Sequence, residues 1–425
     1  MNTEVLGGAD AFLARFEGLR ERLPGDVSVR DEAAALFKAA GLPTVRDEAW
    51  RYTSLRSLAS SSFEEPLTAV GSAPDLAPTL DAPRLVTIDG RYQPELSSPP
   101  ETVTLTTFAD NPVFGHKPDA KQPMVALNTM MADDGIRLHV AAGVDAGTIV
   151  LLSIGVDNHR PVAFHPRHRI ELEAGAKLTI VEVARGEGTY LHNAVHEIVV
   201  GAGATLAHIR LQEESAEAFH VQTGFAEIAE AGTYDAFVLT LGSRLARTEI
   251  HARLTGPTAA VHLNGAQLLG GDQHGDITTV VAHNAPNCAS RQTIKNVLSD
   301  RSRGVFQGRI EVARIAQKTD GYQMNQALLL SPGAEIDCKP QLEIYADDVK
   351  CSHGATVGEL DADQLFFLRS RGIPLEQARS MLVRAFLAEA LDPIAHDDAR
   401  AMLETAVEGW WARRETAALL PKQVS

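Results

Sequence analysis

Between residues 120 and 360, short apolar runs alternate with polar residues, and glycines interrupt them at loosely regular intervals. Such alternation is typical of β-strands, whose successive side chains point to opposite faces. The pattern repeats in the segments 169–183, 197–211 and 225–241, each of which has a central glycine. These glycines are Gly175, Gly203 and Gly232, separated by 28 and 29 residues, and Gly256 follows 24 residues later.

A unit of strand, glycine corner and strand, without a helical stretch, predicts a β-solenoid whose coils stack around one continuous core. A β-sandwich of irregular hairpins is the alternative. The regular return of the glycines favours the solenoid. We therefore predict a mainly β protein with its solenoid core over residues 121–360.

Helical periodicity appears before this core. Apolar residues recur near a 3.6-residue spacing over 12–23 and 31–40, and Gly41 then ends the second helix. The aromatic residues around Trp50 predict an anchor that docks this segment on the main body. We expect an N-terminal helical region over residues 1–80 and an irregular lead-in over 81–120.

Helical spacing returns after Asp361 and predicts a C-terminal helical region over residues 361–425. The first helix ends near Gly372, the second begins at Pro374, and a third begins near Asp397.

The third helix carries two adjacent tryptophans, Trp410 and Trp411, which cannot both face one core. One of them is expected either at a partner surface, where tryptophan is enriched, or docked on the end of the solenoid.

The sharpest chemical feature is a thiol and an imidazole two positions apart, Cys351 and His353, where the strand pattern gives way to a helical one. On an extended chain the two side chains point the same way and are able to bind one metal or sulfur species. The alternative is that the cysteine is a small buried hydrophobe. We interpret the other two cysteines, Cys288 and Cys338, as structural or incidental.

Three widely spaced cysteines argue against a disulfide framework, fit a reducing compartment and cannot alone hold a four-cysteine cluster. No apolar run approaches the roughly 20 residues of a membrane span, and the N-terminus lacks the pattern of a secretory signal. The formal net charge of −16 disfavours a nucleic-acid partner. We therefore expect a cytoplasmic protein with no membrane or nucleic-acid partner.

Several histidines also lie close together in sequence, but we interpret them as hydrogen-bonded or surface residues. In a solenoid, residues distant in sequence stack across coils, so linear spacing is a poor guide to a metal site. The pairs are His165 with His168, His192 with His196, and His274 with His283. No G-x-x-x-x-G-K-[ST] motif occurs in the sequence, so any dependence on ATP must come from another protein.

Six short motifs point to a known family. They are C-S-H-G-A-T-V-G at 351–358, L-R-S-R-G-I-P at 368–374, R-A-F-L-A-E at 384–389, G-L-P-T at 41–44, D-E-A-W-R-Y-T-S-L at 47–55 and R-G-V-F-Q-G at 303–308. With them the chain resembles the SufB/SufD family of iron–sulfur cluster assembly proteins over nearly its full length. The His-Gly-Ala after Cys351 is similar to the SufD branch, whereas the SufB branch tends to carry His-Glu-Ala.

The resemblance implies a right-handed parallel β-helix flanked by helical ends. It also implies a non-catalytic scaffold subunit of the SufBCD complex, which pairs with a SufB-like paralogue through the β-helices and is gripped at its C-terminal helices by a SufC-like ATPase. The candidate ATPase-binding residues are Arg371, Pro374, Arg384, Phe386 and Trp410.

Cys351 and His353 match positions that face the paralogue in this family. The resemblance therefore implies a transient iron or nascent cluster at the interface, with His353 the principal ligand candidate and Cys351 the secondary one. No tightly bound cofactor is expected.

Three other possibilities stay open. The chain made alone is able to form a homodimer, because a surface that pairs with a paralogue of the same fold can pair with itself. It is also possible that the protein is a purely structural adaptor for the ATPase with no iron ligand. A β-helix enzyme acting on polysaccharide is disfavoured by the 5% aromatic content and by the absence of an obvious carboxylate pair on adjacent coils.

Overall fold

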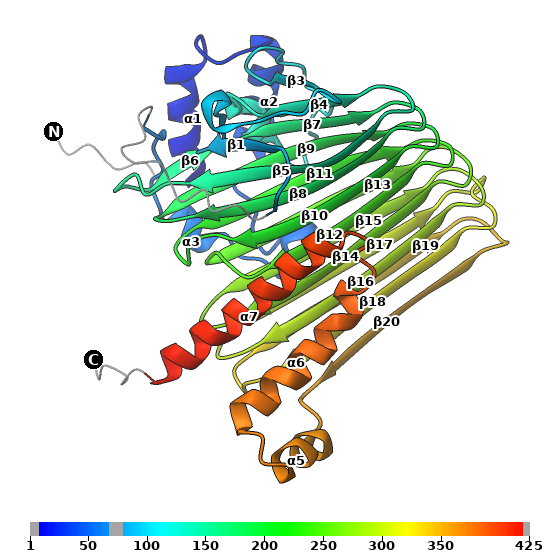
Figure 1. The fold of residues 1–425 in the computed structure, drawn as a ribbon. Coiled ribbons are helices and arrows are strands. Elements are labelled where there is room, and N and C mark those ends of the chain that lie inside the picture. The colour runs from blue at the N-terminus through cyan, green and yellow to red at the C-terminus, as the bar shows by residue number, and fades with distance from the viewer. Residues whose placement is uncertain (1–7, 68–79, 420–425) are drawn as a thin grey trace.

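A computed structural model describes residues 8–67 and 80–419 of the chain. It contains two long sheets, and from β7 onward the chain alternates between them, so that each coil adds one strand to each sheet (Figure 1). Nearly all neighbouring strands are parallel. The predicted parallel β-helix is confirmed. The outer ends of the predicted helical regions, and residues 68–79, lie outside the described residues.

Sheet 1 consists, in spatial order, of β2 (Arg91–Tyr92), β1 (Arg84–Ile88), β5 (Asp145–Gly155), β8 (Lys177–Gly186), β10 (Thr205–Glu213), β12 (Thr233–Thr240), β14 (Ala260–Leu269), β16 (Ala289–Leu298), β18 (Asp320–Leu329) and β20 (Lys350–Gly358). Sheet 2 consists of β19 (Glu335–Ile344), β17 (Arg303–Val312), β15 (His274–His283), β13 (Leu245–Leu254), β11 (Phe219–Ile228), β9 (Tyr190–Val200), β7 (Arg167–Leu172), β4 (Ile136–Val140) and β3 (Thr104–Thr107), with β6 (Val162–Phe164) beside β9.

The segment 81–120 is more ordered than the predicted irregular lead-in. It contains β1, β2, the short 3-10 helix η2 (Pro94–Leu96) and β3. β1 pairs in parallel with β5, while β2 and β3 pair antiparallel with β1 and β4. Because this stretch is rich in proline and serine, its sequence shows no clear strand pattern. Its strands form because they pair with the solenoid, not because of a local alternation of apolar and polar residues.

The corners of the coils use the left-handed backbone conformation, but not always at a glycine. Gly175 and Gly203 have φ values of 70° and 64°, as predicted. In the next coils the corner residues are Ala231 and Thr258, with φ values of 55° and 60°. The prediction that Gly232 turns the chain here is therefore wrong by one residue.

The corners tolerate non-glycine residues because hydrogen bonds between coils hold the backbone in place. The Gly203 N–H donates to Glu230 O at 2.8 Å, and the Ala231 N–H donates to Pro257 O at 2.9 Å. Gly256, which is two residues before the next corner, is needed for another reason. A Cβ atom there would lie 2.1 Å from Glu230 N. Here glycine permits close stacking of the coils rather than a turn.

The apolar core lies between the two sheets. Its inward-facing side chains come from both sheets and include Ile180, Leu206, Ile228, Leu254 and Val261, all nearly inaccessible to solvent. Because inward residues alternate with outward ones along each strand, this stacking explains the alternation in the sequence.

The N-terminal helices α1 (Gly8–Leu19), α2 (Val27–Ala40), α3 (Arg56–Ala59) and α4 (Pro123–Met131), with the 3-10 helix η1 (Glu48–Trp50), cover the outer face of sheet 2. As predicted, Gly41 caps α2 and Trp50 docks on the solenoid. The Arg247 guanidinium lies 4.2 Å from the centroid of the Trp50 ring.

The C-terminal helices α6 (Leu375–Leu391) and α7 (Asp397–Leu419) pack on the outer face of sheet 1, as Figure 1 shows. Helix α5 (Ala362–Ser370) lies beyond the end of the sheets and has no buried residue. Pro374 precedes α6 and Gly372 ends the turn after α5 with a φ of 82°, as predicted. In the described part of the chain, no helix is long and apolar enough to cross a membrane.

Candidate functional site

The solenoid ends at β19 and β20, each of which has a paired strand on one side only. No further coil or helix among the described residues covers this end, which we call the open end. Large apolar side chains lie exposed here: Val357 is 55% accessible, Tyr345 67% and Ile344 38%. An uncovered solenoid end with a free sheet edge is a surface prepared for pairing, since solenoids otherwise need caps.

Cys351 and His353 both lie on β20, two positions apart on an extended strand, and so face the same side. Register places Cys351 beside Gly321 and His353 beside Gln323, an inward-facing and fully buried residue of β18. Cys351 is half-buried and packs against the apolar cluster of Ile310 and Val312, whereas His353 is exposed. The sequence prediction of a shared orientation for the pair therefore holds.

The Cys351 thiol lies in a partly apolar environment. Burial raises its pKa, a hydrogen bond with the backbone of Gly321 opposes this, and the Asp320 carboxylate adds to the rise. The side chain is therefore protonated at neutral pH and has to lose its proton when it binds a metal ion.

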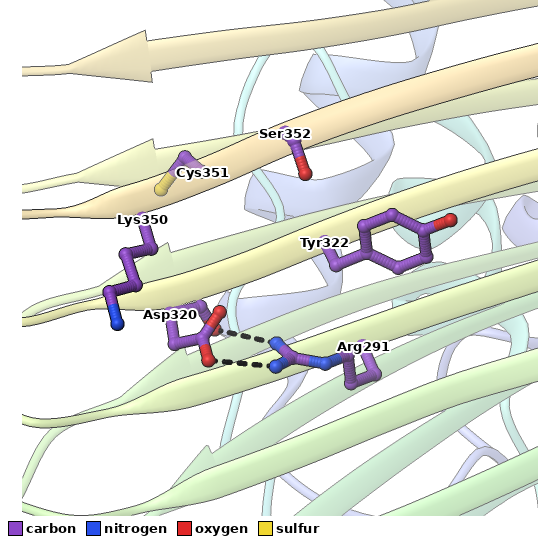
Figure 2. A pocket seen from close by; sticks show the side chains of 6 residues that line it. All are labelled: Arg291, Asp320, Tyr322, Lys350, Cys351 and Ser352. Carbon is purple, nitrogen blue, oxygen red and sulfur yellow. Dashed lines mark hydrogen bonds and ion pairs between the residues drawn. The ribbon is translucent and has the colours of Figure 1, made fainter.

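A shallow hollow of about 470 Å³ adjoins Cys351 on the outer side of the same strands, as Figure 2 shows. Arg291 Nη2 lies 2.8 Å from Asp320 Oδ2, and Lys350 further lowers the pKa of this carboxyl. Tyr322 and Ser352, which are paired in register, form the rest of the wall. Charged groups thus surround the rim of the thiol site.

Cys338 reaches the same end of the solenoid from the opposite sheet. It is on β19, and its thiol is hydrogen-bonded to the side chain of Asn325 on β18. The sequence analysis interpreted Cys338 as structural or incidental. Its proximity to β18, the neighbour of β20, depends on the packing of β19 against β18 and is not visible in the sequence. Cys288 differs, since its Sγ donates to Gly256 O at 3.3 Å inside a corner of the coil, as expected of a structural thiol.

Among residues 8–67 and 80–419, no third side chain suited to binding a metal ion joins Cys351 and His353. Among the described residues, three groups capable of holding a metal ion come together elsewhere, at His192, Glu214 and His220. The open end therefore supplies at most an incomplete ligand set from this chain. Neither His165 with His168 nor His274 with His283 belongs to such a group.

The predicted ATPase-binding residues are placed differently from one another. Arg371 and Pro374 are exposed near α5, and Arg384 on α6 is exposed and paired with Glu408 at 2.7 Å. Phe386 is partly buried, with Lys295 Nζ 4.3 Å from its ring centroid.

Trp410 is an exception, because it is only 5% accessible and packs against the outer face of sheet 1. Of the two positions expected from the sequence, Trp410 is therefore docked on the solenoid and does not lie on an exposed partner surface.

Helix α5 exposes two phenylalanines that the sequence analysis did not name as candidates, beside Arg371, which it did. Phe366 and Phe367 are 73% and 53% accessible, and the Arg371 guanidinium lies 3.3 Å from the Phe367 ring centroid. Adjacent exposed aromatic and arginine side chains are enriched at protein interfaces.

Comparisons with known proteins agree with this architecture. A family model described as SUF system FeS cluster assembly, SufBD core domain, matches residues 154–386. The chain is 38% identical to the iron–sulfur cluster assembly protein SufD of Escherichia coli, with 83% of this chain and 86% of that protein covered.

Two further relatives cover similar lengths. A SufBD-family iron–sulfur cluster assembly protein of Synechocystis is 32% identical, with 87% of each chain covered. The chloroplastic protein ABCI7 of Arabidopsis thaliana is 30% identical, with 90% of this chain and 85% of that protein covered. The chain therefore belongs to the SufB/SufD family of iron–sulfur cluster assembly proteins and is a homologue of SufD.

Proposed function

We propose that this chain is a non-catalytic, SufD-like scaffold subunit of a cytoplasmic iron–sulfur cluster assembly complex. Its open end pairs with a SufB-like paralogue, and a transient iron ion or nascent cluster forms at that interface with His353 and Cys351 as ligands. The observation that carries this proposal is the position of the two residues on the last, uncovered strand of the solenoid.

The exposed strands explain how a paralogue of the same fold would bind. β19 and β20 present unpaired edges together with Ile344, Tyr345 and Val357. A second β-helix offers matching strand edges and an apolar lumen, so pairing continues the hydrogen-bond ladder and buries these side chains. A homodimer of the isolated chain uses the same surface.

The incomplete ligand set supports a transient site. An imidazole and a thiolate suit iron and sulfide, and positions left open by this chain allow the partner to supply ligands and the cluster to leave. A resident cofactor would need more ligands than Cys351 and His353 provide.

A SufC-like ATPase is expected to bind the C-terminal helices around α5. Exposed Phe366 and Phe367 together with Arg371 supply an aromatic and cationic surface. ATP-driven movement of this region would then strain or expose the site between the two β-helices, which is a domain-level switch.

The test is anaerobic co-expression with a SufB-like paralogue and a SufC-like ATPase, followed by capture on this chain and measurement of bound iron and sulfide. We expect all three subunits to co-elute, and His353→Ala and Cys351→Ser to reduce iron and sulfide while the complex stays intact. Thr356→Val, on the outward side of the same strand and outside the hollow, is the matched control and leaves the metal content unchanged.

Two results would overturn parts of the proposal. Intact complexes with unchanged iron and sulfide in both site variants would favour the purely structural adaptor. Recovery of the chain without either partner would contradict the proposal that it is a subunit of an assembly complex.

A further inference from the structure

The interior of the β-helix holds a cluster of buried ionisable side chains far from the open end. His192 on β9, Glu214 just after β10 and His220 on β11 are each no more than 5% accessible. His192 and His220 are direct neighbours in the register of sheet 2, and Glu214 approaches them from the corner that connects sheet 1 to sheet 2. Four strands of sheet 1, from β12 to β18, separate β10 from β20.

The three side chains converge on one point. His192 Nδ1 lies 3.0 Å from Glu214 Oε1, and His220 Nδ1 lies 2.6 Å from Glu214 Oε2. One ligand atom from each of the three residues lies within 4.8 Å of the other two. Around a four-coordinate ion with bonds of about 2.0–2.1 Å, ligand atoms are about 3.3 Å apart, so small shifts suffice to admit an ion.

His220 and Glu214 form an ion pair whose geometry falls short of a well-formed hydrogen bond. Despite its distance, buried His220 Nδ1 has no partner of acceptable hydrogen-bond geometry. The hydroxyl of Tyr190, whose pKa is raised by burial and then by Glu214, is also buried without a well-formed hydrogen bond. Unpaired buried polar atoms are costly, and two that surround one carboxylate indicate a missing ligand.

Neighbouring side chains fix which nitrogen of His220 faces the carboxylate. Gln222 Nε2 lies 2.9 Å from His196 Nδ1 and is able to donate to it, which leaves Gln222 Oε1 to accept from His220 Nε2 at 3.5 Å. The Nδ1 atom of His220 then presents either a second proton or its lone pair to Glu214. An outer partner of this kind is typical of histidines that bind metals.

We propose that His192, Glu214 and His220 form a binding site for one divalent first-row transition-metal ion inside the β-helix. Two imidazole nitrogens and a carboxylate are a ligand set used for Zn²⁺ and for non-haem Fe²⁺. The ion replaces the proton between His220 and Glu214, relieves the unpaired nitrogen and cross-links a corner of one coil to two strands of sheet 2.

A neighbouring side chain holds the Glu214 carboxylate in place. Gln212 Nε2 donates to Glu214 Oε2 at 2.9 Å and to Ser243 Oγ at 2.7 Å, which orients the carboxylate from behind. This site is independent of the proposed function, because neither Cys351 nor His353 takes part.

The experiment uses the full chain, stripped of metal with a chelator and titrated anaerobically with Co²⁺ as the probe. The variant background Cys338→Ser, Cys351→Ser and His353→Ala removes candidate ligands at the open end. We expect one equivalent of Co²⁺ with visible ligand-field absorption, displaced by Zn²⁺ or Fe²⁺. Glu214→Gln and His220→Asn each weaken binding at least about 100-fold, since loss of outer partners alone costs 10- to 100-fold.

His139→Asn, a partly exposed histidine on β4, is the matched control and retains Co²⁺ binding. The melting temperature gives a second readout that does not depend on absorption. Zn²⁺ raises it in the background chain and leaves it unchanged in His192→Asn. Absence of Co²⁺ binding in the folded background chain, or equal binding in Glu214→Gln, would overturn the site.

Discussion

The two ends of the β-helix differ in how the parallel sheets stop. At the N-terminal end, antiparallel strands β2 and β3 close the sheets, and helix α4, with all nine residues buried, packs nearby. At the C-terminal end β19 and β20 stop without a cover among the described residues, and most of β20 is exposed. The closed end resembles the interior of a folded domain, whereas the open end resembles half of an interface. Residues near the closed end should therefore control folding, and those at the open end should control assembly.

The largest expected effect is near the closed end. Buried Arg167 contacts Glu197 at 2.6 Å and donates to Thr129 Oγ1 at 3.0 Å. Arg167→Met leaves the Glu197 carboxylate buried without its main partner, and we expect the free energy of unfolding in urea to fall by about 3–5 kcal/mol. The matched control is Arg253→Met, which removes an exposed pair with Glu227 and costs less than about 1 kcal/mol. Equal losses of unfolding free energy in Arg167→Met and Arg253→Met would contradict the expected difference between the buried and the exposed ion pair.

The next effect concerns pH and the buried histidines of the coils. Burial lowers the pKa of His283 to about 4, from about 6.5 in the unfolded chain. The unfolded state therefore takes up a proton first as the pH falls, so stability is full above pH 6.5 and declines toward pH 4. This residue contributes up to about 3 kcal/mol of the loss. His283→Gln should flatten the dependence of the unfolding free energy on pH, and an unchanged slope would argue against burial as the cause.

At the open end, a charge should affect binding more than folding. Val357 lies on the inward side of β20 but is 55% accessible, because no coil follows it. We expect Val357→Lys to change the unfolding free energy by less than about 0.5 kcal/mol. Its affinity for the SufB-like paralogue, measured by calorimetry, should fall about 30-fold, or about 2 kcal/mol.

Thr356→Lys tests whether the position on β20 matters, rather than the added charge. Thr356 is the exposed outward neighbour of Val357 on the same strand. Thr356→Lys should lower the affinity for the SufB-like paralogue much less than Val357→Lys does. A similar loss in both variants would mean that the lumen of the open end is not the contact.

The smallest effect, counted for one pH unit, is the pH dependence of metal binding at the open end. Because burial raises the pKa of Cys351, the thiol loses a proton when it binds a metal ion. In a His220→Asn background, which lacks the proposed interior site, affinity for Co²⁺ should rise about tenfold per pH unit between about pH 6.5 and 8.5, or about 1.4 kcal/mol per unit. Cys351→Ser should abolish this rise. A pH-independent affinity would exclude the thiolate as a ligand.

Sequence patterns predicted the fold and placed the candidate residues on one strand, because both depend on local rules. Alternation and the glycine repeat follow from stacked coils, and Cys351 with His353 lie on one strand at a spacing of two. The strands of residues 81–120 depend on pairing with distant residues, so the sequence did not predict them. The cluster of His192, Glu214 and His220 was also hidden, since only the solenoid register brings β9 and β11 together.

The placement of the tryptophans shows the same limit on a smaller scale. Helical spacing indicated that Trp410 and Trp411 point in different directions, but not which of them faces the solenoid. In the structure Trp410 is buried within the apolar cluster between α7 and sheet 1, and Trp411 is partly buried against the same cluster. The prediction that both cannot face one core is therefore wrong in part. A side-chain environment that depends on tertiary packing is not encoded in a short window of sequence.

The measurement that tests the central claim most directly is amide hydrogen exchange of the chain alone and in complex with the SufB-like paralogue. The unpaired edges of β19 and β20 are predicted to exchange quickly in the free chain and to become strongly protected in the complex. Protection confined to other strands, with residues 335–358 unchanged, would contradict the assignment of the open end as the assembly surface.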